Sequence, residues 1–213
     1  MYNTVLFDLD GTLTDSQYGI INSIIYALKK FDIEVDDKSQ LKKFLGPPLH
    51  ESFANNFGFS GEKALLAVDY YREYFHDKGI FENEVYEGVY ELLDKIKASG
   101  KKIILATSKP EEYAIRILEH FDLAKYFDVI AGATMDGSRS KKADVIEYAL
   151  KRGNVENLEE AIMVGDRDHD ILGSKKFGLD SIGVLYGYGS IDELNEAGAT
   201  YIAETVEDIL EYL

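Results

Sequence analysis

The sequence predicts an α/β fold: a doubly wound, Rossmann-like parallel sheet joined to a small all-helical domain. One observation is that short apolar runs alternate with amphipathic helical segments through most of the chain, which is typical of parallel sheets. A second is that this alternation stops directly after the first run and resumes only near Gly88. A third is that polar residues follow several of the runs, at the sheet edge where α/β proteins bind ligands.

Apolar runs mark the candidate strands. The first run, Val5-Leu6-Phe7, is uninterrupted and is bounded by a turn at Gly11, as expected for a buried parallel strand. Further strands are expected at 102–106, 129–131, 161–164, 181–185 and 201–202.

Helical periodicity fills the gaps between these strands. A helix at 89–98 ends before Gly100, and Pro110 opens a helix at 111–121, where proline is tolerated. Apolar residues at Val145, Ile146 and Ala149 predict a helix at 143–151. Further helices are expected at 170–177, 192–196 and 206–213.

The interruption after the first strand is predicted to be a helical domain of residues 15–82, inserted into a core of residues 1–14 and 83–213. Isoleucines between Ile20 and Leu28 form one broad apolar helix face. Further helices are expected at 41–45, 49–57 and 62–78, and Gly46-Pro47-Pro48 breaks the series. The aromatic residues of this insertion are expected to form its own small core.

Composition limits the classes of partner. The chain has 213 residues, with 39 acidic against 23 basic side chains and a formal net charge of −16. Such an acidic surface repels nucleic acid and anionic membranes. The chain has no cysteine, which excludes disulfides and cysteine-ligated zinc. No apolar run approaches the ~20 residues of a membrane span, and the first strand begins too early for a signal peptide. We therefore expect a cytoplasmic protein, as a monomer or weak dimer.

Two carboxylates follow the first strand. Asp8 and Asp10 stand one residue apart at its carboxyl end, where both can reach one site. Acids this close repel each other unless a proton or cation lies between them, and Mg²⁺ suits oxygen ligands and leaves positions open for a phosphate. The alternative is a solvated strand end with turn-forming aspartates. A helix-loop-helix calcium loop is excluded because Gly11 comes fourth in the run.

Two later segments could bind an anion. Thr107 ends the strand 102–106, and it is either a helix N-cap or a ligand of a phosphate oxygen. Lys141 and Lys142 precede the helix 143–151, where cations oppose the helix dipole. An anion nearby would explain this pair, and an exposed basic pair is the alternative.

A second acidic segment follows the strand 161–164. Asp166 and Asp170 are four residues apart at a helix start, which places them on one side of the helix. A cluster that merely caps the helix is the alternative. Asp168 and His169 are expected to face outward.

These four motifs, in this order, resemble those of the haloacid dehalogenase superfamily. The resemblance covers the whole chain and rests on the run Asp8-Leu9-Asp10-Gly11-Thr12 and the later Thr, Lys and Gly-Asp-x-x-x-Asp positions. It implies that Asp8 is a nucleophile and that Asp10 donates and accepts protons. It also implies that Mg²⁺ is held by Asp8, the backbone carbonyl of Asp10 and Asp166, with Asp170 orienting a metal-bound water.

The resemblance further implies a phosphate clamp. Thr107, with the backbone N–H of Ser108, would hold one phosphoryl oxygen. Lys142, favoured over Lys141 because it is nearer the helix, would hold another.

The helical insertion resembles a cap domain, and Gly46-Pro47-Pro48-Leu49 resembles the cap loop of phosphoglycolate phosphatases. Gly46 would then contact the leaving group; an ordinary interhelical turn is the alternative. The implied function is Mg²⁺-dependent hydrolysis of a small phosphate monoester, such as phosphoglycolate or a nucleoside monophosphate, through an aspartyl phosphate. A sugar phosphomutase of the β-phosphoglucomutase type is a second interpretation. A phospho-aspartate signalling domain is a third, although such domains have about half this length and no cap.

Overall fold

The computed structural model describes residues 2–46 and 48–213, so Pro47 of the predicted cap loop lies outside the described residues. The chain forms two compact units. The sheet unit comprises the residues up to Asp15 together with Val85–Leu213, and the helical unit comprises Ser16–Glu84. The sequence predicted domain boundaries after residues 14 and 82, and these boundaries stay predictions.

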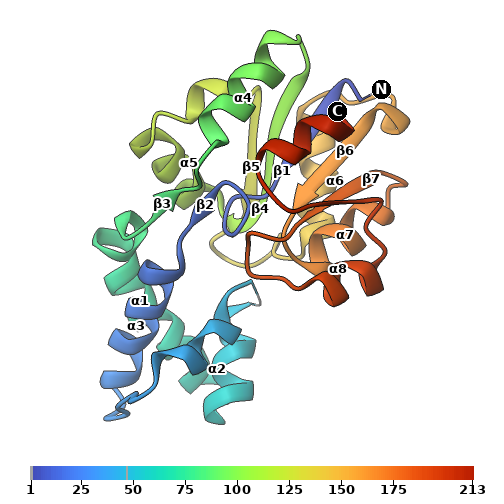
Figure 1. Ribbon diagram of the computed structural model, residues 1–213. Coiled ribbons are helices and arrows are strands. Elements are labelled where there is room, and N and C mark those ends of the chain that lie inside the picture. Colours follow the sequence, from blue (N-terminus) through green and yellow to red (C-terminus); the bar gives the residue numbers. More distant parts are fainter. Residues whose placement is uncertain (1, 47) are drawn as a thin grey trace. The chain divides into compact units, whose positions relative to one another are not determined.

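The sheet unit contains a six-stranded parallel sheet of order β5-β4-β1-β6-β7-β8 (Figure 1). The fold class predicted from the sequence is confirmed. The strands are β1 (Thr4–Phe7), β4 (Lys102–Pro110), β5 (Val129–Ala133), β6 (Ala161–Gly165), β7 (Asp180–Val184) and β8 (Tyr201–Ala203). Because β4 and β6 flank β1, the strand order reverses beside β1, and such a switch point is where open α/β sheets bind ligands.

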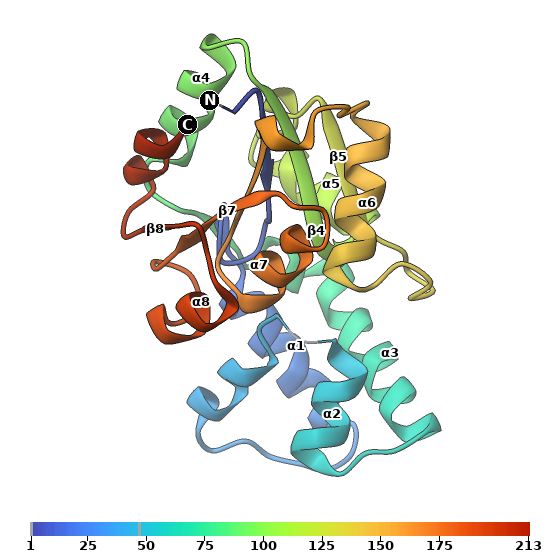
Figure 2. The same ribbon diagram turned by 90° about the vertical axis from the view of Figure 1, so that its right-hand side faces the viewer.

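Helices cover both faces of this sheet. They are α4 (Val89–Ala98), α5 (Glu111–His120), α6 (Lys142–Arg152), α7 (Asp168–Lys175) and α8 (Ile191–Ala197), with short 3₁₀ helices η3 (Ala124–Tyr126), η4 (Leu158–Glu160) and η5 (Glu207–Tyr212). Figure 2 shows α6 on one side of the sheet and α4 with η5 on the other. The expected final helix is therefore a 3₁₀ helix. Helix α7 begins two residues earlier than expected, because the Asp170 side chain accepts a hydrogen bond from the Arg167 N–H and caps it.

A buried core lies between α6 and the sheet. Val145, Ile146 and Ala149 of α6 belong to one apolar cluster with Leu6 of β1 and Met163 of β6, and all five are fully buried. The apolar spacing that predicted this helix is thus its sheet-facing side. Packing of this kind fixes the start of α6 relative to the strand ends.

The helical unit contains α1 (Gln17–Lys29), η1 (Lys38–Phe44), α2 (Leu49–Phe57), α3 (Glu62–Asp77) and η2 (Gly79–Phe81). The expected helix at 41–45 is a 3₁₀ helix that begins earlier. Phe44 and Phe53 are buried with ring centroids 5.3 Å apart, and Phe53 stacks on Phe59 at 6.1 Å. The aromatic side chains thus pack on one another, as predicted. The two-residue strands β2 (Thr14–Asp15) and β3 (Glu84–Val85), which the sequence did not predict, form a second small sheet.

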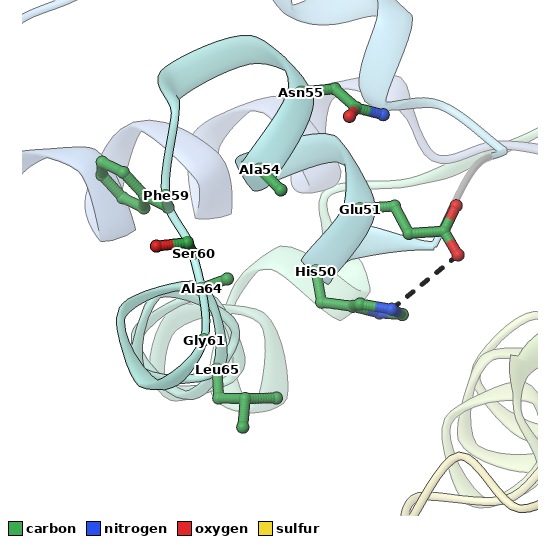
Figure 3. A pocket seen from close by; sticks show the side chains of 9 residues that line it. All are labelled: His50, Glu51, Ala54, Asn55, Phe59, Ser60, Gly61, Ala64 and Leu65. Atoms are coloured by element: carbon green, nitrogen blue, oxygen red, sulfur yellow. Dashed lines mark ion pairs between the residues drawn. The ribbon is translucent and has the colours of Figure 1, made fainter.

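An open groove of about 530 Å³ lies within the helical unit, between α2 and the start of α3 (Figure 3). Its lining includes His50 and Glu51, with His50 Nε2 3.8 Å from Glu51 Oε1. Gly46 does not line this groove. Among the described residues, no helix combines the length and apolarity needed to cross a membrane.

Candidate active site

Three adjacent strands bring three of the predicted site residues to one edge of the sheet. Phe7 of β1 pairs in register with Leu105 of β4 and Val164 of β6. The residues that follow these positions therefore emerge side by side. Asp8 is 5% exposed, and Thr107 and Asp166 are almost completely buried.

Lys142 is the cation at the centre of this group. Its Nζ lies 2.8 Å from Asp8 Oδ1 and 2.7 Å from Asp170 Oδ1, and it donates to the carbonyl of Ala106 at 3.0 Å. The side chain is 1% exposed, whereas Lys141 is exposed. The structure thus places Lys142, and not Lys141, among the carboxylates, and its catalytic role stays a prediction.

The ionisation of Asp8 is set by two opposing effects. Burial opposes the charged form, but the charge of Lys142 and its hydrogen bond outweigh burial and hold the pKa of Asp8 below its usual value. Burial likewise opposes the charge on Lys142, yet Asp170 and Asp8 raise its pKa. Asp8 is therefore an ionised carboxylate that is shielded from water.

Asp166 has the opposite environment. Burial, followed by the charges of Asp170 and Asp8, raises its pKa well above its usual range. One of its oxygens accepts a hydrogen bond from the Tyr188 N–H at 2.8 Å, and the other lies 3.5 Å from Thr12 Oγ1; neither group carries a charge. Its negative charge is thus poorly compensated by the protein, which is the condition that a bound cation relieves.

Two glycines approach Asp166 so closely that neither position has room for a side chain. A Cβ atom at Gly11, where φ is +79°, would lie 2.2 Å from an Asp166 carboxylate oxygen, and one at Gly187 would lie 2.4 Å from Asp166 Cβ. The segment Gly187-Tyr188-Gly189, to which the sequence assigned no role, therefore forms one wall of this carboxylate's site. Only the spacing of its glycines could have indicated a close approach.

Asp170 is held from two sides. Its Oδ1 pairs with Lys142 and its Oδ2 accepts from the Arg167 N–H at 3.1 Å. A Cβ atom at Gly165 would lie 2.3 Å from Asp170 Cγ, so a glycine is required at the end of β6. Both oxygens are engaged by the protein, which fits a supporting position behind the other acids.

His169 lies closer to the site than expected. One of its ring nitrogens and carboxylate oxygens of Asp8 and Asp170 all lie within 4.8 Å of one another, and its side chain is 30% exposed. The expectation that His169 faces outward is therefore wrong. This trio and Asp166 offer the groups from which a cation site could be built; the oxygen-rich set suits a hard ion such as Mg²⁺.

The remaining predicted residues are Asp10, Ser108 and Gly46. Asp10 is partly exposed, and its Oδ2 lies 3.0 Å from the Nζ of Lys109, a residue that the motifs did not single out. Ser108 is half-buried beside Thr107 at the end of β4. Gly46 has a φ of +102°, which favours glycine, and belongs to the helical unit; its role at the site stays a prediction.

Comparison with known proteins identifies the family. Residues 5–184 match the haloacid dehalogenase-like hydrolases. The chain belongs to this family. It is 41% identical to a 5′-nucleotidase of Pseudomonas aeruginosa over 94% of this chain and 90% of that protein. It is 39% identical to the tyrosine-protein kinase PtkA of Mycobacterium tuberculosis over 98% of this chain and 72% of that protein.

Comparison with solved structures supports the same family. A predicted phosphatase from Clostridium acetobutylicum superposes with a TM-score of 0.95 at 52% identity, covering 100% of this chain and 98% of that one. The chain is thus a phosphatase of the haloacid dehalogenase-like family, that is, a phosphoric monoester hydrolase.

Proposed function

We propose that this hydrolase is Mg²⁺-dependent and cleaves a small phosphate monoester through an aspartyl-phosphate intermediate. The observation that carries the proposal is the environment of Asp8, a buried carboxylate kept ionised by Lys142 beside the switch point of the sheet. An ionised, desolvated carboxylate is the nucleophile that phosphoryl transfer to an aspartate requires.

In the first step, a carboxylate oxygen of Asp8 attacks phosphorus, and the ester P–O bond breaks. Asp10 gives its proton to the departing oxygen, which leaves as an alcohol. Thr107, the Ser108 N–H and Lys142 hold the non-bridging oxygens, where negative charge is greatest.

In the second step, water attacks the phosphorus of the aspartyl phosphate. Asp10, now a carboxylate, takes a proton from that water, and the bond between phosphorus and the Asp8 oxygen breaks. Inorganic phosphate leaves, and both acids return to their starting states.

A divalent cation fits the donors present. Asp8, Asp166 and the backbone carbonyl of Asp10 would hold it, with Asp170 behind them; the poorly compensated charge of Asp166 supports this assignment. When bound, Mg²⁺ offsets the negative charge of the phosphoryl oxygens.

The helical unit and the relatives support a proposed substrate class. Gly46 and its loop would contact the leaving group as part of a cap, and a nucleoside monophosphate or phosphoglycolate is the proposed type of ester. The proposal includes a cytoplasmic location and a monomer or weak dimer.

A panel of phosphate esters assayed with Mg²⁺ for release of inorganic phosphate tests this function. We expect catalytic turnover of at least one small ester, and none in the Asp8→Asn variant. Isomerisation of β-glucose 1-phosphate without phosphate release would instead indicate a mutase. Stoichiometric phosphorylation of the protein without turnover would indicate a signalling domain.

A further inference from the structure

Lys109 is a nearly buried cation beside the group proposed to transfer protons. Its Nζ lies 3.0 Å from Asp10 Oδ2, and the two side chains are 6% and 21% exposed. The second oxygen of Asp10, Oδ1, is buried and has no hydrogen-bond partner among the residues that the structure describes. The ion pair thus engages one carboxylate oxygen and leaves the other available.

An irregularity in β4 accompanies the position of Lys109. The pairing of β4 with β5 shifts register between Thr107 and Pro110, and Ser108 and Lys109 lie within the shift. Such irregularities re-aim side chains at strand ends. The Lys109 N–H donates to Thr107 Oγ1 at 3.2 Å, which ties the irregular segment to a predicted phosphate ligand.

Gly132 on the neighbouring strand β5 allows the backbone of β4 to follow this irregular path. A Cβ atom at Gly132 would lie 2.7 Å from the Lys109 carbonyl oxygen and 2.6 Å from Glu111 Cα. The Gly132 N–H also donates to the Glu111 carboxylate at 3.1 Å. The backbone that carries Lys109 is therefore closely supported by β5.

We propose that Lys109 is a positioning residue for Asp10. By holding Oδ2, it presents Oδ1 first to the leaving-group oxygen and then to the attacking water. This inference rests on the proposed function, because it needs Asp10 to transfer protons, and it adds a residue that none of the four motifs assigns.

Proton transfer requires this kind of restraint, since donor and acceptor must approach to about 2.6–3.2 Å. Asp10 enters the first step protonated on Oδ1, while Lys109 donates to the unprotonated Oδ2; the Oδ1–H bond then breaks, and its proton goes to the leaving oxygen as the ester P–O bond breaks. In the second step Oδ1 takes a proton from water as the water oxygen bonds to phosphorus. Lys109 keeps its own protons in both steps.

The test compares two esters of similar size in the Lys109→Met variant, by kcat/KM with saturating Mg²⁺. The ratio kcat/KM depends only on substrate binding and on the steps up to cleavage of the ester bond. Benzyl phosphate needs a proton on its leaving oxygen, whereas p-nitrophenolate is a stable anion that leaves without one. Because general acid catalysis is worth about 10²–10⁴-fold, we expect kcat/KM for benzyl phosphate to fall at least about tenfold. The value for p-nitrophenyl phosphate should stay close to that of the wild type.

Two further variants separate positioning from folding. Lys141→Met, which removes an exposed lysine near the site, should leave both constants unchanged. Because the chain has no cysteine, Lys109→Cys can be alkylated by 2-bromoethylamine at that position alone, in unfolded protein that is then refolded beside treated wild type. The product carries an ammonium group on a side chain of nearly lysine length, and it should restore hydrolysis of benzyl phosphate.

Equal losses for both esters would show that Lys109 binds the phosphoryl group or supports the fold, and would overturn the proposal. Unchanged constants for both would also overturn it, and so would an alkylated variant that hydrolyses p-nitrophenyl phosphate normally but stays slow on benzyl phosphate. Failure of the proposed function has a different signature, namely full turnover in the Asp8→Asn variant or none in the wild type.

Discussion

Replacing Lys142 by methionine removes an ammonium group that touches both Asp8 and Asp170. Methionine has a similar volume, so the substitution removes charge with little change in packing. The two carboxylates stay buried, and each loses a contact shorter than 2.9 Å. The variant therefore isolates the electrostatic contribution of this lysine.

The expected losses are large for both stability and activity. Removing one partner of a buried ion pair costs about 3–5 kcal/mol, because the other charge is left uncompensated. Removing a preorganised group that stabilises the transition state lowers kcat by about 10²–10³-fold. In contrast, Lys141→Met changes an exposed residue and should shift stability by less than about 0.5 kcal/mol.

The pH dependence of the stability loss identifies its cause. In the wild type the pKa of Asp8 is lowered in the folded state, so its stabilisation is present above the usual carboxyl pKa of about 3.9 and is lost as pH falls below it. Without Lys142, only the smaller effects of His169 and Thr107 oppose burial, so we expect the pKa to rise and the charged Asp8 to destabilise the variant near neutral pH. Protonation relieves this cost as pH falls. The raised pKa of Lys142 itself affects stability only in alkaline solution, as pH rises through it.

Urea unfolding of both proteins in EDTA, at pH 7 and near pH 4.5, measures this difference. The free-energy gap between wild type and Lys142→Met should be largest at pH 7 and clearly smaller at the lower pH. A gap that is the same at both pH values would refute the electrostatic argument and point to packing. A Lys141→Met variant that loses as much free energy of unfolding as Lys142→Met would also refute the argument.

Three other predictions concern the same site and the helical unit. Asp8→Asn should lose turnover by several orders of magnitude in a phosphate-release assay while its circular dichroism stays native; more than a few per cent of residual activity would contradict its role as nucleophile. Asp166→Asn removes a buried acid whose ionised form the protein compensates poorly, so it should leave the metal-free protein as stable as the wild type or more so. It should also abolish the Mg²⁺-induced rise in Tm, which for the wild type corresponds to about 2.7 kcal/mol at a hundredfold excess over Kd; an undiminished rise would place the metal elsewhere. Gly46→Val strains a backbone with φ of +102° and should lower kcat/KM for the best small ester while sparing p-nitrophenyl phosphate, whereas a parallel fall for both would make Gly46 structural.

The sheet could be predicted because its signals are local. Each strand is a short apolar run, and a run such as Val5-Leu6-Phe7 carries both its burial and its end in a few residues. Asp8, Thr107 and Asp166 follow three such runs, and a parallel sheet brings the ends of adjacent strands together. To predict that these residues lie close together, only the correct strand order was needed.

Other features depend on contacts between distant segments, which no local pattern encodes. Lys109 reaches Asp10 from an irregular strand end that is supported by Gly132. Tyr188 donates to Asp166 from a loop after the next strand. The start of α7 was misplaced because it is fixed by a side-chain hydrogen bond rather than by apolar periodicity, and no local pattern marks the approach of His169 to Asp8 and Asp170. The 3₁₀ helices were misassigned because short helical turns share the residue preferences of α-helix ends.

The charges of the site explain why its parts must act together. Its carboxylates are Asp8, Asp10, Asp166 and Asp170, and its ammonium groups are Lys109 and Lys142. With Asp8, Asp166 and Asp170 ionised and Asp10 holding the proton that it donates in the first step, three negative and two positive charges leave a net charge of −1, which repels a phosphate ester. The raised pKa of Asp166 shows how the protein alone reduces this repulsion, by favouring a proton on that acid. A divalent cation would give the group a net positive charge and let Asp166 ionise, so that binding of metal and binding of phosphate should be cooperative.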